Sequence, residues 1–173
     1  FVQDVALNSL LDSSQPDSLQ NIYSDHQRYV ETLFNSILVS GQWSEGTSAF
    51  MRKLLLSPTI DQNDILTIIS SIMLSLMNVF DVEKWVTLLS IYENAVYERV
   101  RQRAFVGWVL CAPKSGIPLF PEVEEGISRV LDDKMKREEL LQLQMQLFYC
   151  ANAESDKERI QKEIIPTLVK NSN

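Results

Sequence analysis

The sequence has few of the residues on which most small catalytic and ligand-binding sites depend. Among its 173 residues are one histidine, two cysteines and five glycines. A single imidazole cannot form a multi-histidine metal site, and two distant cysteines cannot supply a zinc site of cysteine ligands. The five glycines are isolated from one another, so no glycine-rich phosphate-binding loop is present. The sequence therefore predicts no catalytic residue, no metal site and no cofactor.

Glycine and proline are scarce, and no hydrophobic run is long enough for a membrane span. With 45% apolar residues, five glycines and six prolines, the composition excludes collagen-like, low-complexity and disordered chains. The longest uncharged run, residues 65–80, is shorter than the roughly 20 residues that span a bilayer. Asp61, Asp64 and Asp81 flank it closely. The run is typical of a buried core helix, and we expect no membrane partner.

The two cysteines indicate the cellular compartment, and the first residue indicates whether the chain is part of a longer protein. Cys111 and Cys150 both lie in apolar stretches, where a free cysteine behaves as a small hydrophobic residue. We expect two buried thiols, which suit a reducing compartment such as the cytoplasm, and a single disulfide between them stays the alternative. The chain begins with Phe1 rather than methionine, so we expect it to be part of a longer protein.

What the sequence does contain is a helical pattern along its whole length. Apolar residues recur at helical spacing, no segment alternates apolar with polar residues, and no Asn-Gly or Asp-Gly hairpin turn occurs. Ser44, Asp61 and Asp81 are suitable N-caps, and Ser155 with Glu158 three residues later indicates a capping box. The sequence predicts eight or nine helices. They are expected at 2–11, 17–40, 44–56, 61–79, from Asp81, and at 98–112, 121–133, 137–151 and from Ser155.

Short, abrupt turns join these helices, so neighbouring helices are expected to pack antiparallel. A run of such hairpins, with a repeat of roughly 40 residues, is typical of helical-repeat proteins. We therefore predict an all-α fold, a right-handed α-solenoid of about four antiparallel helical hairpins that occupies residues 1–173 as a single domain. A closed all-α helical bundle has the same periodicity and stays the alternative.

The most informative stretch is the expected helix at 98–112. Val100, Ala104 and Trp108 share one of its faces, and Gly107 and Cys111 extend that face. Small side chains at 104 and 107 would allow a neighbouring helix to approach closely, while Trp108 fills the space beside them. From residue 105 onward the helix is apolar on every side. We expect it to be covered from two directions, as in the middle of a stacked array.

The run Val100-Arg101-Gln102-Arg103-Ala104 resembles the second helix of a HEAT repeat, in which Val-Arg is followed by Ala three residues after the Arg. Residues 164–170 are similar to the first helix of such a repeat, where Pro166 would bend the helix. The resemblance to HEAT-like and armadillo-like helical-repeat proteins implies a stacked array of helices. It also implies that the surface of the array binds a protein or an extended peptide.

No pattern in the chain indicates catalysis. Ser24, Asp25 and His26 are adjacent in the sequence, but consecutive residues of a helix point in different directions. A nucleophile and its base need a geometry that this spacing does not supply, so we expect His26 to be solvated. The acidic residues that follow Pro121 have a structural explanation, because carboxylates stabilise the first turn of a helix.

Three residues are candidates for contact with a partner. Arg99 and Arg103 share a helix face, and Trp43 lies in a turn, where exposed aromatic residues often anchor partners. Trp43 can equally pack back onto the helix that Ser44 begins, and we favour that interpretation. The formal net charge of −7 disfavours nucleic acid, because an acidic chain repels phosphates unless its basic residues gather on one face.

We therefore expect a protein that is not an enzyme and that serves as a protein–protein interaction scaffold through a helical-repeat surface. Arg99, Arg101 and Arg103 keep a nucleic-acid-binding HEAT-like domain as an alternative, since proteins of this kind include nucleic-acid binders. An accessory domain of a larger enzyme is the other alternative. The step from fold to function rests on analogy with the resembled family.

Overall fold

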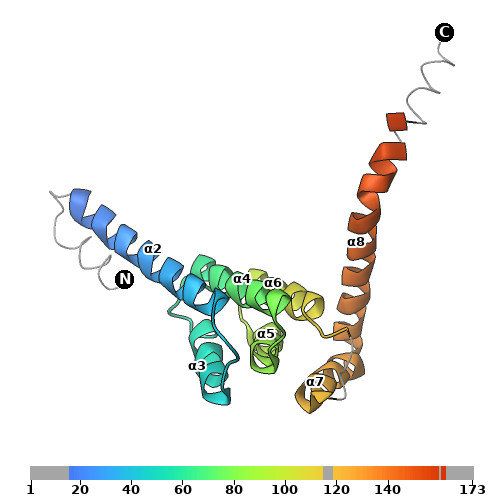
Figure 1. Cartoon of the computed structure of the whole chain (residues 1–173), viewed down its shortest axis with the longest axis horizontal. Helices are drawn as coiled ribbons and strands as arrows, with labels where there is room; N and C mark the ends of the chain where they lie inside the picture. Colours follow the sequence, from blue (N-terminus) through green and yellow to red (C-terminus); the bar gives the residue numbers. More distant parts are fainter. Residues whose placement is uncertain (1–15, 115–118, 160, 163–173) are drawn as a thin grey trace, which may run out of the picture. The chain divides into compact units, whose positions relative to one another are not determined.

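A computed structural model describes residues 16–114, 119–159 and 161–162, and all of the regular structure in those ranges is helical. Figure 1 shows the helices, which are labelled α2 to α8. Their bounds are α2 Pro16–Leu38, α3 Glu45–Leu55, α4 Gln62–Asn78, α5 Val82–Asn94, α6 Glu98–Leu110, α7 Pro121–Asp132 and α8 Lys134–Arg159. The predicted all-α fold is confirmed for this part of the chain.

The chain divides into two compact units. The first is Phe1–Gly126, which includes α2 to α6, and the second is Ile127–Asn173, which includes α8. The boundary falls within α7. The assignment of residues 1–173 to a single helical-repeat domain stays a prediction.

Within the first unit, helices pack mainly on others two places away in the chain, and α5 also packs on both of its neighbours. α2 packs on α4 and α4 on α6, while α3 packs on α5, and α5 packs on both α4 and α6. Figure 1 shows α2, α4 and α6 in one row, with α3 and α5 beside it. The buried apolar side chains of α4, α5 and α6 form the core between these helices.

The predicted helix starts at three polar caps are confirmed. The Ser44 side chain accepts a hydrogen bond from the Thr47 backbone N–H at 3.2 Å, and α3 begins at the next residue. Asp61 caps α4 through the Asn63 N–H at 2.8 Å, and Asp81 caps α5 in the same way. Each cap satisfies a backbone donor that the first helical turn leaves without a partner. A serine or aspartate in front of an apolar helical pattern therefore predicts the helix start correctly at these three positions.

The predicted break near residue 155 is wrong, because α8 runs without interruption from Lys134 to Arg159. The helix also begins earlier than expected, since the Asp133 side chain accepts the Met135 N–H at 2.9 Å and so acts as its cap. No proline or glycine lies between residues 134 and 159 to stop the helix. The capping pattern of Ser155 and Glu158 can begin a helix, but it does not by itself end a helix that precedes it. The segments at 2–11 and 164–170 lie outside the described residues.

Aromatic side chains join α5 to α6. The rings of Trp85 and Trp108 meet edge to face with centroids 5.8 Å apart, and Tyr92 stacks on Phe105 at 4.9 Å. The Trp85 Nε1–H donates to the Trp108 carbonyl oxygen at 2.9 Å. Edge-to-face and offset-stacked aromatic pairs contribute beyond their buried area, so this contact fixes α6 against α5.

Gly107 lets α6 approach two other helices at once. A Cβ atom at this position would lie 2.8 Å from Met73 Cγ on α4 and 3.2 Å from Leu88 Cδ1 on α5. These separations are closer than ordinary carbon–carbon contacts. The predicted close approach at residue 107 is therefore confirmed, and α6 is covered at this point from two directions.

We predict that Trp108→Ala lowers the free energy of unfolding by about 3–5 kcal/mol, the usual cost of removing a buried tryptophan. Trp108 is 3% exposed, and its Nε1 has no hydrogen-bond partner among the described residues, so the loss comes from packing alone. Urea denaturation measures it. Phe50→Ala is the control, because Phe50 is 63% exposed, and this change is expected to cost under about 0.5 kcal/mol. Equal losses in the two variants would contradict the position of α6.

Candidate functional site

A buried polar cluster joins the α2–α3 turn to α4 and α5. Lys84 is 2% exposed, and its Nζ donates to the backbone oxygens of Ser40 at 3.2 Å and Gly41 at 3.0 Å. The same ammonium donates to Ser75 Oγ at 2.9 Å and lies 3.8 Å from Asp81 Oδ2. An ammonium group has three donors. All three are engaged within the protein.

Asp81 accepts the other hydrogen bonds of this cluster. Its Oδ2 accepts the Trp43 backbone N–H at 2.7 Å, and its Oδ1 accepts the Glu83 and Lys84 N–H groups at 2.9 and 3.2 Å. Burial lowers the pKa of Lys84, because removal from water disfavours the charged amine by more than Asp81 favours it. A hollow of about 360 Å³ adjoins the pair. With its donors engaged, Lys84 holds the α2–α3 turn against α4 and α5.

The clearest candidate for a binding surface is a groove between α4 and α6. We call this hollow of about 310 Å³ the arginine groove, and it is lined by Leu66, Arg99, Gln102, Arg103 and Val106. Arg99 is exposed, and Arg103 Nη1 donates to Ser70 Oγ at 2.7 Å. In the described part of the chain neither arginine has a carboxylate partner. Arg101 differs, because its Nε lies 3.0 Å from Glu98 Oε2.

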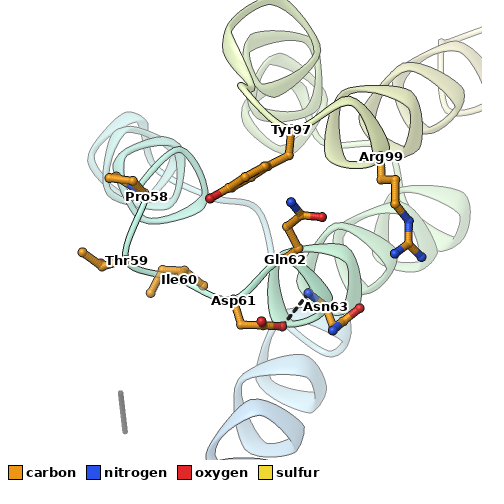
Figure 2. A pocket seen from close by; sticks show the side chains of 8 residues that line it. All are labelled: Pro58, Thr59, Ile60, Asp61, Gln62, Asn63, Tyr97 and Arg99. Carbon is orange, nitrogen blue, oxygen red and sulfur yellow. Dashed lines mark hydrogen bonds between the residues drawn. The ribbon is translucent and has the colours of Figure 1, made fainter. Parts of the chain in front are cut away.

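Two further hollows continue from the arginine groove. The polar hollow, about 460 Å³, shares Arg99 with it and is lined by Pro58, Thr59, Ile60, Asp61, Gln62, Asn63, Tyr97 and Arg99 (Figure 2). The apolar hollow, about 170 Å³, is lined by Leu55, Leu56, Ser57, Pro58, Ile65, Ala95, Val96, Tyr97 and Val100. Because consecutive hollows share lining residues, the three form one continuous surface.

Tyr97 and Arg99 divide this surface. Figure 2 shows Tyr97 extending to the side of Pro58, whereas Arg99 extends away from it. Asp61 also lines the polar hollow, but its Oδ1 already accepts the Asn63 N–H at 2.8 Å. Val96, beside Tyr97, is 92% exposed. The surface therefore runs from an apolar end at Val96 to a basic end at Arg103.

The structure brings two of the three predicted partner-binding residues together. Arg99 and Arg103 line the same groove, whereas Trp43 lies in the α2–α3 turn and lines neither that groove nor the two hollows beside it. The Trp43 indole Nε1–H donates to Ser40 Oγ at 3.1 Å, and Lys84 Nζ lies 5.5 Å from its ring centroid. These contacts account for Trp43 within the fold, and its role in partner binding stays a prediction.

Sequence reasoning missed the loop residues that complete this surface. Val96 and Tyr97 belong to the α5–α6 turn and meet the α3–α4 turn at Pro58, which is far away in the chain. Their proximity follows from the packing of α3 on α5 and of α4 on α6. An apolar Val-Tyr pair in a turn was the one signal that could have identified them.

His26 is not solvated as the sequence predicts. Its Nε2 lies 2.8 Å from Asp64 Oδ2, and both side chains are about three-quarters buried between α2 and α4. Asp25 instead contacts Arg28, with Oδ1 2.8 Å from Nη2. The hydrogen bond from α2 to α4 gives His26 a structural role and does not bring it to a nucleophile. Nothing in the local sequence indicates Asp64 as its partner.

Comparisons of the chain with models of known families, with curated proteins and with solved structures find no match. Within the ranges that the structure describes, no three His, Cys, Asp or Glu side chains form a group that could hold a metal ion. Over the same ranges, no helix combines the length and the apolarity that crossing a bilayer requires.

We predict that Lys84→Met lowers the free energy of unfolding by about 3–5 kcal/mol, because it leaves Asp81 as a buried charge without its cation. Two backbone oxygens and the Ser75 hydroxyl also lose their donor. Lys53→Met, at an exposed position of α3, serves as the matched control and is expected to change stability by less than about 0.5 kcal/mol. Urea denaturation of both variants measures the difference. A loss under about 1 kcal/mol for Lys84→Met would argue against the buried pair.

We predict different reactivities for the two free cysteines. Cys111 is buried, with its Sγ 3.6 Å from the Met73 oxygen, whereas Cys150 is exposed, contrary to the prediction of two buried thiols. Burial raises the pKa of Cys111 to about 11, so only about one thiol in a thousand is ionised at pH 8. An aromatic disulfide reagent at pH 8 should label Cys150 in the folded chain and Cys111 only after denaturation. Rapid labelling of Cys150→Ser would contradict this.

Proposed function

We propose that this chain is a non-catalytic protein–protein interaction scaffold built as a HEAT-like α-solenoid. The packing of helices two apart in the chain supports this fold, because it leaves one row with α2, α4 and α6 and another with α3 and α5. Stacking of successive helical hairpins produces this arrangement. The match of Val100-Arg101 and Ala104 to the second helix of a HEAT repeat falls on α6, and Gly107 packs closely there.

The observation that carries the proposal is the arginine groove. Two arginines four residues apart line one open hollow, and in the described part of the chain no carboxylate pairs with either of them. In a chain of net charge −7, intramolecular partners for arginine are plentiful. Arginines are among the residues that contribute most to protein interfaces, since their planar guanidinium groups bind carboxylates in a bidentate manner.

The surroundings of the groove favour a protein partner over nucleic acid. Leu66 and Val106 line it together with the arginines, and the apolar hollow at Val96 continues the same surface. Mixed apolar and arginine surfaces are typical of protein interfaces. Nucleic acid instead requires a wide basic stripe that neutralises many phosphates, and the acidic balance of this chain opposes it.

We predict that Arg99→Glu with Arg103→Glu leaves the fold intact but reduces capture of a partner protein at least about tenfold, because each reversed charge loses a charge-assisted contact. Affinity capture from lysate of the source cells, quantified by mass spectrometry, compares this variant with the wild-type chain. Circular dichroism checks that the variant is folded.

The matched control is Lys134→Glu with Lys157→Glu. Both lysines are exposed on α8, and the double change alters the net charge by the same amount. The control should retain the partner that the groove variant loses. Identical capture by all three chains would contradict the proposed interaction surface, and duplex DNA binding at low salt that the groove variant abolishes would assign the groove to nucleic acid.

A further inference from the structure

We infer that the continuous surface from the apolar hollow to the arginine groove binds an extended peptide segment of the partner that carries one aliphatic side chain at one end and two acidic residues, at alternating positions, at the other. This inference rests on the proposed function and adds the chemistry of the partner. Three observations carry it: the polarity of the two ends of the surface, the spacing of the arginines, and the position of Tyr97.

The apolar end takes a single side chain. The apolar hollow has a volume of about 170 Å³, below the roughly 300–1,000 Å³ of pockets that hold whole small molecules. Its lining is almost entirely aliphatic and aromatic, and Val96 at its edge is 92% exposed. A leucine, isoleucine or valine side chain that enters it would cover the exposed Val96, whereas Val100 is already buried within the fold.

The spacing of the arginines selects the positions of the acidic residues. Arg99 and Arg103 are four residues apart on α6, which corresponds to about 6 Å along a helix axis. In an extended peptide, side chains two residues apart lie on the same side and are separated by about 6.6 Å. Two acidic residues with one residue between them therefore match the two guanidinium groups. Gln102 lines the groove between them and adds no charge.

The polar hollow explains why the acidic residues belong at the groove end. Asp61 lines this hollow and would repel a carboxylate placed beside it, whereas no acidic residue lines the arginine groove. Tyr97 lines both the apolar hollow and this polar stretch, and Figure 2 shows its side chain extending to the side of Pro58. The peptide therefore needs a polar, uncharged spacer between its aliphatic and acidic parts.

Fluorescence polarisation with labelled synthetic peptides tests the inference on the full chain. The parent peptides contain one leucine, a Gly-Ser spacer of roughly two to four residues and two glutamates in alternation. At low salt, at least one parent should bind. Replacement of both glutamates by glutamine should weaken binding about tenfold, and replacement of leucine by serine should have a comparable effect. Higher salt should weaken the parent but not the glutamine peptide.

The protein variants complete the test. Arg99→Glu with Arg103→Glu should abolish binding of the parent peptide, while the control Lys134→Glu with Lys157→Glu should bind it as the wild-type chain does. Equal binding of the glutamate and glutamine peptides, binding that survives the arginine changes, or no binding of any parent would each overturn the inference. The chain could also prove to self-associate, with only the arginine changes abolishing the self-association. That result would assign the surface to a second copy of the chain and would also overturn the inference.

The failure of this inference is distinguishable from the failure of the proposed function. If no parent peptide binds, but the arginine variant still loses a captured protein that the control retains, the groove is an interaction surface for a partner of different chemistry. If capture is unchanged in the arginine variant, the groove is not the interaction surface, and the proposed function itself fails.

Discussion

The first unit depends on one buried ion pair, Asp81 with Lys84. Asp81 caps α5 and at the same time accepts the backbone N–H of Trp43, while Lys84 donates to the two carbonyls at 40 and 41 and to Ser75 on α4. One cluster therefore determines where the α2–α3 turn lies, where α5 begins and how α4 passes beside both. Burial of two charges is costly unless every polar atom has a partner, so the pair specifies one arrangement of these segments and penalises others.

The positions of α5 and α6 follow from this cluster. Immediately after Lys84, Trp85 contacts Trp108 through its ring and donates its indole N–H to the Trp108 carbonyl. Gly107 then allows α6 to lie close to α4, and the side chain of Arg103 reaches Ser70 across the same gap. The arginine groove is therefore lined by two helices whose separation is fixed by packed side chains. A partner would meet an existing surface, which reduces the entropy lost on binding.

The features that could be predicted from the sequence are those whose causes are local. Ser44, Asp61 and Asp81 hydrogen-bond to backbone groups two or three residues away, so their role as caps is visible in the sequence itself. Lys84 could not be recognised as buried, since its partners at 40, 41 and 75 come from segments that only the tertiary fold brings near. The same reason hides the contact of His26 with Asp64. Cys150 lies in an apolar stretch and is nevertheless exposed. Its exposure could not be predicted, because the periodicity of a helix shows which residues can be buried but not which other segment covers them.

The candidate surface was predictable only in its arginines, and the comparison with Arg101 shows why those two matter. Three arginines alternate along one turn of α6, yet Glu98 contacts Arg101, whose guanidinium also lies 5.4 Å from the Tyr92 ring centroid. Arg101 is thus used within the fold. Arg99 and Arg103 project to a different side of the same helix, where Leu66 and Val106 are their neighbours. An ion pair within the chain would stabilise an exposed arginine by under about 1 kcal/mol, so its absence costs the fold little and leaves both guanidinium groups available to a carboxylate from outside.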